Sequence, residues 1–194
     1  MNAPLHVLDV AAHADTSALL GRIDALERHG VRVSVLCAAA AQAEAVRQGT
    51  RRSVLIGALD DDPWWTTIRL AASWSQQERV DVLRAHDSAS HVLAVLAGAL
   101  CECATVALLG SAEVPMLDLE AHRMGDAAYL CAPCEAALAH ARAIGVSPAR
   151  LQLVDRGWPA EVQDLAMVDL LRRAARSEPA ASTRERTTAA LPRA

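Results

Sequence analysis

The sequence has no phenylalanine and few other aromatic residues, which together make up only 3% of its 194 residues. Hydrophobic residues still reach 53% of the chain, so alanine, leucine and valine must fill the interior. Small side chains of this kind suit helices that pack closely on a sheet. The length, and apolar segments spread evenly to about residue 175, predict one folded domain rather than two.

The sequence also lacks an excess of positive charge and long apolar runs. The formal net charge of −4 excludes the broad positive field that nucleic-acid-binding proteins use, so no nucleic acid partner is expected. No apolar run reaches the roughly 18 to 20 residues that a membrane span needs. The first residues, MNAPLHVLDV, lack the basic segment of a signal peptide. We therefore expect no membrane span and a cytoplasmic location.

The five cysteines are an odd number and do not suggest a disulfide framework. Cys37, Cys101 and Cys103 fall within or beside apolar segments, where small buried thiols pack well. Reduced thiols in a reducing compartment fit this pattern. A zinc site that combined Cys101 and Cys103 with Cys131 and Cys134 is the least favoured option, because Cys-x-Cys is not a usual zinc-ligand spacing. We expect no metal and no cofactor.

Short apolar segments alternate with segments of helical periodicity along the whole chain. Strands are predicted at 5–10, 31–37, 53–56, 80–85, 105–109, 127–132 and 151–154. Helices are predicted between 16 and 29, at 39–48, after Pro63, at 88–100, up to Met124, at 135–144 and at 161–175. This alternation predicts an α/β fold with a single doubly wound, mainly parallel sheet and helices on both faces.

Three parts of the chain are distinguished by composition. Residues 1–159 form the predicted Rossmann-like domain, and 160–176 form a C-terminal helix that packs back on it. From 177 to 194 the chain is rich in Ser, Thr, Arg, Pro and Ala without periodicity, which predicts a disordered tail.

Two stretches resemble the N-terminal, acceptor-side domain of GT-B glycosyltransferases of family 4. They are RVDVLRAHDSASHVLAVLAGAL at 79–100 and RMGDAAYLCAPCEAALAHARAIGVSPARLQLVDRGWP at 123–159, and the opening from HVLDV to HGVRVSVLC fits the same family's first βαβ unit. Together they cover residues 5–159. The resemblance implies that this domain receives a sugar or lipid acceptor, while the donor nucleotide sugar binds mostly to a second domain. We expect that second domain to be absent, so that the chain does not transfer sugar alone and is either catalytically inactive or acts only with a separate donor-domain subunit.

The sequence departs from the family pattern at three places. The loop after the first strand, AAHADTS at 11–17, has no glycine where the family has a Gly-rich loop. Leu109 stands before Gly110 where the family commonly has its active-site histidine, and leucine cannot transfer a proton. At the family's hinge, Gly157 is kept but the preceding Asn is replaced by Arg156. These departures predict lost or displaced catalysis.

The strongest polar cluster follows the predicted strand at 80–85 and contains His86, Asp87, Ser88 and His91. Ligands of open α/β sheets bind beyond the carboxyl ends of the strands, so these four residues are predicted to bind substrate. His86 and Asp87 are the expected acceptor contacts. The alternative is that Asp87 and Ser88 cap the next helix and that His91 is a solvated residue on its first turn.

The first strand is followed by a second group of candidate binding residues, His13, Asp15 and Thr16. Capping of the following helix by Asp15 or Thr16 is the competing interpretation. Trp64, Trp65 and Trp74 have the flat faces that stack on sugars, although tryptophans at this spacing more often anchor a helix to its surroundings.

Two hypotheses from other classes stay open. One is a non-enzymatic binding or scaffold module that kept the fold and lost the site. The other is a thiol redox protein that uses Cys131-Ala-Pro-Cys134, with Cys134 near a helix N-terminus that would lower its pKa.

Overall fold

The structure is a computed structural model that describes residues 4–12, 15–49, 54–57, 64–125 and 128–177. Its centre is a parallel sheet of seven strands in the order β3-β2-β1-β4-β5-β6-β7. The strands are β1 His6–Ala11, β2 Arg32–Cys37, β3 Val54–Ile56, β4 Val82–Ala85, β5 Ala104–Leu108, β6 Ala128–Ala132 and β7 Leu151–Leu153. The strand order reverses between β1 and β4, so the prediction of a single doubly wound parallel sheet is confirmed.

A helix follows each strand, as a parallel sheet requires for its crossovers. The helices are α1 Thr16–Arg28, α2 Ala40–Gly49, α3 Trp64–Glu78, α4 Ser88–Cys101, α5 Met116–Met124, α6 Glu135–Ala143 and α7 Ala160–Arg176, with a 3₁₀ turn at Pro148–Arg150. None of the helices in the described ranges has both the length and the apolar character needed to cross a membrane.

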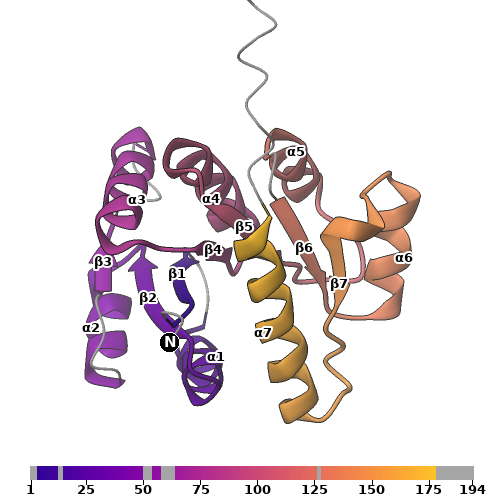
Figure 1. Cartoon of the computed structure of the whole chain (residues 1–194), viewed down its shortest axis with the longest axis horizontal. Helices are drawn as coiled ribbons and strands as arrows, with labels where there is room; N and C mark the ends of the chain where they lie inside the picture. The colour runs from indigo at the N-terminus through magenta and orange to yellow at the C-terminus, as the bar shows by residue number, and fades with distance from the viewer. Residues whose placement is uncertain (1–3, 13–14, 50–53, 58–63, 126–127, 178–194) are drawn as a thin grey trace, which may run out of the picture.

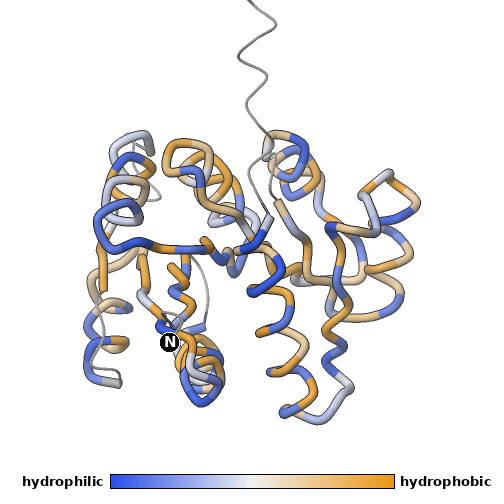
Figure 2. The backbone as a smooth tube through the Cα atoms, in the orientation of Figure 1, coloured by the Kyte–Doolittle hydropathy of each residue, from blue (hydrophilic) through white to orange (hydrophobic). Residues whose placement is uncertain are grey.

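The two faces of the sheet bury different helices (Figure 1). Alternate residues of a strand point to opposite faces, so Val7 packs with α1, α2 and α7 while Leu8 packs with α3, α4 and α6. Each face has its own core cluster of mainly Ala, Val and Leu side chains. Figure 2 shows α4 as predominantly hydrophobic, and nearly all residues from Ser90 to Gly98 in this helix are buried.

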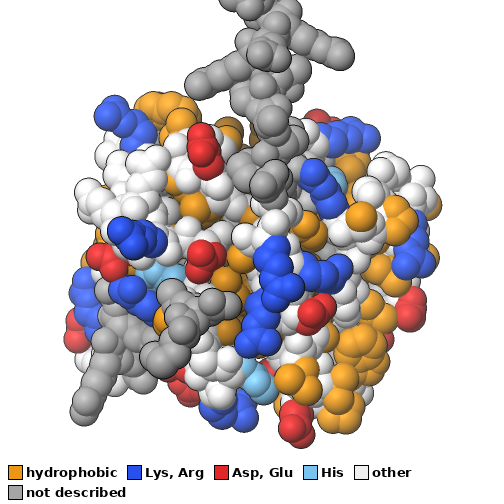
Figure 3. Space-filling model, viewed as in Figure 1, with side chains coloured by type: hydrophobic (Ala, Val, Ile, Leu, Met, Phe, Trp, Pro, Cys, Tyr) orange, Lys and Arg blue, Asp and Glu red, His pale blue; other side chains and the backbone are white. Residues whose placement is uncertain are grey.

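The last helix, α7, lies across β4 and β5 and contacts α1. Its buried residues are Val168, Leu170, Leu171 and Ala174, which continue the core that begins under α1. Figure 3 shows arginine side chains gathered over the C-terminal end of α7, where the last turn carries Arg173 and Arg176. Cations there oppose the negative end of the helix dipole. The tail predicted from residue 177 falls, except for Ser177, outside the described residues.

Candidate functional site

A buried ion pair lies at the centre of the sheet, where the strand order reverses. Asp9 of β1 and Arg84 of β4 are direct partners in the strand register and point to the α1 and α7 face. The Nε and Nη2 atoms of Arg84 donate to the two carboxylate oxygens at 2.6 and 2.5 Å. Burial by itself would raise the pKa of Asp9, but the charge of Arg84 holds this pKa well below its usual value. Asp9 is therefore ionised across the physiological pH range.

His86 extends this pair toward α1. Its imidazole is completely buried, and its Nε2 atom lies 3.3 Å from Asp9 Oδ2, in a contact that lacks hydrogen-bond alignment. Arg22 of α1 donates from Nη1 to His86 Nδ1 at 3.1 Å, since arginine has no acceptor. The ring proton of neutral His86 is then on Nε2, beside Asp9. Burial is the main reason that the pKa of His86 is lowered, which keeps the ring neutral near pH 7.

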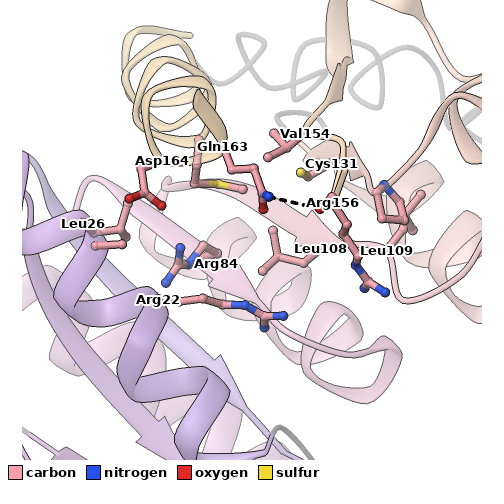
Figure 4. A pocket seen from close by; sticks show the side chains of 13 residues that line it. Arg22, Leu26, Arg84, Leu108, Leu109, Cys131, Val154, Arg156, Gln163 and Asp164 are labelled. Atoms are coloured by element: carbon pink, nitrogen blue, oxygen red, sulfur yellow. Dashed lines mark hydrogen bonds between the residues drawn. The ribbon is translucent and has the colours of Figure 1, made fainter. Parts of the chain in front are cut away.

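A pocket opens beside this cluster, between α1 and α7 and over the carboxyl-terminal parts of β4, β5 and β6 (Figure 4). Its volume is about 120 Å³. Its lining mixes arginines with apolar side chains and consists of Arg22, Ala25, Leu26, Arg84, Leu108, Leu109, Cys131, Pro133, Val154, Arg156, Gln163, Asp164 and Met167.

The segment between β7 and α7 brings Arg156 to this pocket through a tight turn. The backbone N–H of Gly157 donates to Asp155 Oδ1 at 2.7 Å. The Gln163 side chain then donates to the carbonyl oxygens of Trp158, at 2.7 Å, and Arg156, at 3.2 Å. These bonds tie the turn to the first residues of α7, so the wall formed by α7 and the position of Arg156 depend on each other.

The predicted cluster after β4 is divided between the two faces of the sheet. His86 lies in the pocket-side network, whereas Ser88 and His91 belong to the α4–α5 contact on the opposite face. There Asp118 of α5 accepts from Ser88 Oγ at 2.6 Å and from His91 Nδ1 at 2.7 Å. His91 is completely buried, so the interpretation of a solvated histidine is wrong: the first turn of α4 faces α5.

The histidines of the α4–α5 contact carry unsatisfied polar atoms. Within the described part of the chain, His91 Nε2 and His122 Nδ1 are buried without a hydrogen-bond partner. Burial, followed by the effect of His91, lowers the pKa of His122 to about 4. His122 is therefore neutral near pH 7 inside this contact.

Asp87 and Asp15 act as helix N-caps. Asp87 Oδ1 accepts from the backbone N–H of Ser90, and Asp15 Oδ1 from that of Ser17, each at 2.8 Å. Ser90 Oγ in turn accepts the backbone N–H of Ala12 at 2.9 Å, which ties the end of β1 to the start of α4. Both aspartates thus lie at the carboxyl edge of the sheet, while His13 falls outside the described residues.

The cysteines are all unpaired thiols, including Cys131 and Cys134 of the suggested redox motif. Burial raises the pKa of Cys131 to about 12, which opposes formation of the reactive thiolate. Burial also contributes to a raised pKa of Cys103, after its hydrogen bond with Cys101. No group of three or more potential metal ligands is present within the described ranges.

The tryptophans of α3 differ in their surroundings. The Trp74 ring packs edge-on against His6 with 5.8 Å between ring centres, at the border of the core. Trp65 is exposed and lines a shallow groove between α3 and Leu100. The side chain of Trp64 lies outside the described residues.

Sequence reasoning missed Asp9, Arg84, Arg22 and the pocket role of Arg156. A usable signal was present for two of them, because Asp9 and Arg84 are the charged residues within the apolar strand segments HVLDVA and VLRA. A charge in a buried strand needs a partner. Arg22 had no such signal, since an arginine on a helix normally faces solvent.

Comparison with known proteins identifies relatives of this fold. The family model described as Glycosyltransferase Family 4 matches residues 21–161. No curated protein matches the chain.

Similar solved structures include a glycosyltransferase from Rickettsia africae, with 11% identity and a TM-score of 0.63 over 80% of this chain and 44% of that one. HepE of Anabaena, solved in complex with UDP and glucose, has 15% identity and a TM-score of 0.57 over 78% and 44%. The UDP-N-acetylglucosamine 2-epimerase of Rickettsia bellii has 10% identity and a TM-score of 0.60 over 88% and 47%. This likeness is one of fold, and the chain spans less than half the length of each of these proteins.

Proposed function

Since the chain belongs to glycosyltransferase family 4, we propose that it forms the acceptor-side half of a sugar-transfer site and does not transfer sugar by itself. The observation that carries this proposal is the family match over residues 21–161, on a fold predicted from the sequence as a family 4 GT-B half and confirmed as such. The match ends close to the turn at Arg156 and Gly157, where the sequence resembles the family's hinge.

The donor half is proposed to come from another polypeptide domain. Its support is that the similar structures are more than twice as long as the part this chain covers, and that one of them holds UDP and glucose. The location is proposed to be cytoplasmic, because the five cysteines are free thiols, as expected in a reducing compartment.

The acceptor is proposed to be a sugar or a lipid, bound at the carboxyl edge of β1 and β4. Asp15 and Asp87 lie at this edge, and the bond between Ala12 and Ser90 holds the two loops together. His13 belongs to the same loop in the sequence. His86 supports this edge indirectly, through its contacts with Asp9 and Arg22, because its own ring is buried.

A sugar-transfer assay tests this proposal. The chain is purified alone and together with a co-expressed donor-domain polypeptide encoded next to it, and UDP release from UDP-glucose and UDP-N-acetylglucosamine is measured with sugar and lipid acceptors. We expect release only from the combined proteins. Turnover by the chain alone, or a combined sample no more active than the donor polypeptide by itself, would contradict the proposal.

A second candidate function is a binding or scaffold module without catalysis. It is favoured by Leu109, which places an aliphatic side chain where the resembling family commonly has its histidine, and by the absence of glycine from residues 11–17. A scaffold would bind the donor polypeptide while leaving its turnover unchanged. Titration of acceptors on the chain separates the two functions, because a pure scaffold binds none of them.

A further inference from the structure

We propose that the pocket between α1 and α7 is a binding site for an organic phosphate monoester. The phosphate contacts the guanidinium groups of Arg22, Arg84 and Arg156, and the organic body lies against the aliphatic wall. This site does not depend on the proposed sugar transfer, because its argument rests only on the chemistry of the pocket.

The three arginines come from separate elements and face one space. Arg22 projects from α1, Arg84 from β4 and Arg156 from the turn before α7. Figure 4 shows Arg22, which projects from α1, and Arg156 on different sides of the pocket that both line. Arg22 and Arg156 are both exposed to solvent, so they are accessible to a ligand that enters the pocket.

Arg84 supplies a buried donor that is aimed at the pocket. Its side chain is 2% exposed, and its Nε and Nη2 atoms are occupied by Asp9. The remaining atom, Nη1, has no hydrogen-bond partner among the residues that the structure describes. Because arginine carries five donors in a rigid fork, an arginine held by Asp9 on one edge presents its other edge in a fixed direction.

The charge balance of the pocket is positive. Asp9, behind the lining, offsets Arg84, and the acid of the lining itself, Asp164, is paired with Arg28 at 3.3 Å. Positive charge around Cys131 supports this balance: Arg84, Arg22 and Arg156 all act to lower the pKa of its thiol, although burial outweighs them. An anion would relieve the mutual repulsion of Arg22, Arg84 and Arg156.

Phosphate suits this arrangement better than carboxylate. A phosphate monoester carries about −1.5 to −2 charges near pH 7 and presents three terminal oxygens, one for each guanidinium group. A carboxylate is planar and offers one charge and two oxygens. The remaining walls are Leu26, Leu108, Leu109, Val154 and Met167, and they favour an apolar substituent on the phosphate.

Calorimetric titration with small probes tests the site. The probes are phenyl phosphate, benzoate and benzyl alcohol, which share a ring and differ in the polar group. We expect phenyl phosphate to bind most tightly and its affinity to fall as salt is added. Equal affinity for benzoate would overturn the assignment to phosphate, and equal affinity for benzyl alcohol, or no binding of phenyl phosphate, would overturn an anion site altogether.

Substitution of the exposed arginines locates the binding. Arg22→Met and Arg156→Met should each weaken phenyl phosphate binding by about tenfold or more, which corresponds to the loss of one charge-assisted hydrogen bond. Arg142→Met on α6, an exposed arginine on the other face, is the matched control and should bind like the parent protein. Affinity that is unchanged in both pocket variants would overturn this location. A chain that binds phenyl phosphate but never supports sugar transfer would keep this site and remove the proposed function.

Discussion

His86 and His91 are close in the sequence and equally buried, but they serve different parts of the molecule. His86 leaves β4 on the face covered by α1 and α7, where it joins Asp9, Arg22 and the pocket. His91, on the first turns of α4, faces α5 and is bonded to Asp118. Both histidines sit beside an aspartate, but His86 is also hydrogen-bonded to Arg22, an arginine that is open to solvent and lines the pocket. A histidine next to a carboxylate is therefore not a binding site by itself. Whether the surrounding side chains can be reached from solvent decides between ligand binding and packing in the core.

The largest loss of stability is expected when the buried pair of the pocket-side network, Asp9 and Arg84, is broken. Arg84→Met leaves the carboxylate of Asp9 buried without its main partner and should lower the free energy of unfolding by about 3–5 kcal/mol. Urea denaturation followed by circular dichroism measures this change. The double variant Asp9→Leu with Arg84→Met removes both charges and should recover most of the loss. Arg123→Met, which breaks an exposed pair with Glu120, should change stability by less than about 1 kcal/mol. A double variant as unstable as Arg84→Met would contradict the pairing argument.

The second-largest loss of stability is expected when the α4–α5 contact is broken. Asp118→Ala leaves the buried Nδ1–H of His91 and the hydroxyl of Ser88 without their acceptor, so we expect a loss of about 2–3 kcal/mol. Thermal unfolding is the measurement, and Asp169→Ala on the exposed side of α7 is the control. If binding of phenyl phosphate at the pocket fell in Asp118→Ala to the extent seen in Arg22→Met, the separation of the two networks would be wrong.

The stability contributed by the α4–α5 contact should depend on pH, because this contact contains His122. The folded-state pKa of His122 is about 4, below its ordinary value of 6.5, so protonation favours the unfolded chain. The stability that depends on neutral His122 is fully present above pH 6.5 and is lost as the pH falls toward about 4. In His122→Gln the decrease in unfolding free energy across this window should be smaller by roughly 1 kcal/mol, a value reduced for the partial exposure of the ring. Denaturant titrations at several pH values check this, and equal decreases in both proteins would exclude His122 as a contributor.

The smallest effect on stability is expected at the open edge of the pocket. Arg22→Met removes the donor to buried His86 Nδ1 but also relieves the repulsion of Arg22 by Arg84 and Arg156, so the unfolding free energy should fall by no more than about 1 kcal/mol. Urea denaturation of this variant, compared with Arg156→Met, measures the change. A loss as large as that in Arg84→Met would show that Arg22 has a structural role and would weaken the contrast with the α4–α5 contact.

The order of strands and helices could be predicted from the sequence because the signals that define them are local. Apolar alternation in segments such as VRVSVLC, helical spacing and glycine stops each depend on residues within one element. The family resemblance was inferred from the same local signals, and the family match confirms it. The caps Asp15 and Asp87 were recognised as one of two interpretations for the same reason, since a capping side chain bonds to the backbone of the next residues.

The candidate site was decided by contacts between residues far apart in the chain. Asp9 meets Arg84 because β1 and β4 become neighbours at the reversal of strand order, and the pocket exists because α7 returns over β4 and β5. Which face receives His86 and which receives His91 follows from the direction of β4 and the start of α4, a geometric choice that residue types do not encode. The sequence alone therefore determined the layers of this protein, whereas only the packing of those layers determined which of its charges are buried, which are paired and which remain free to bind.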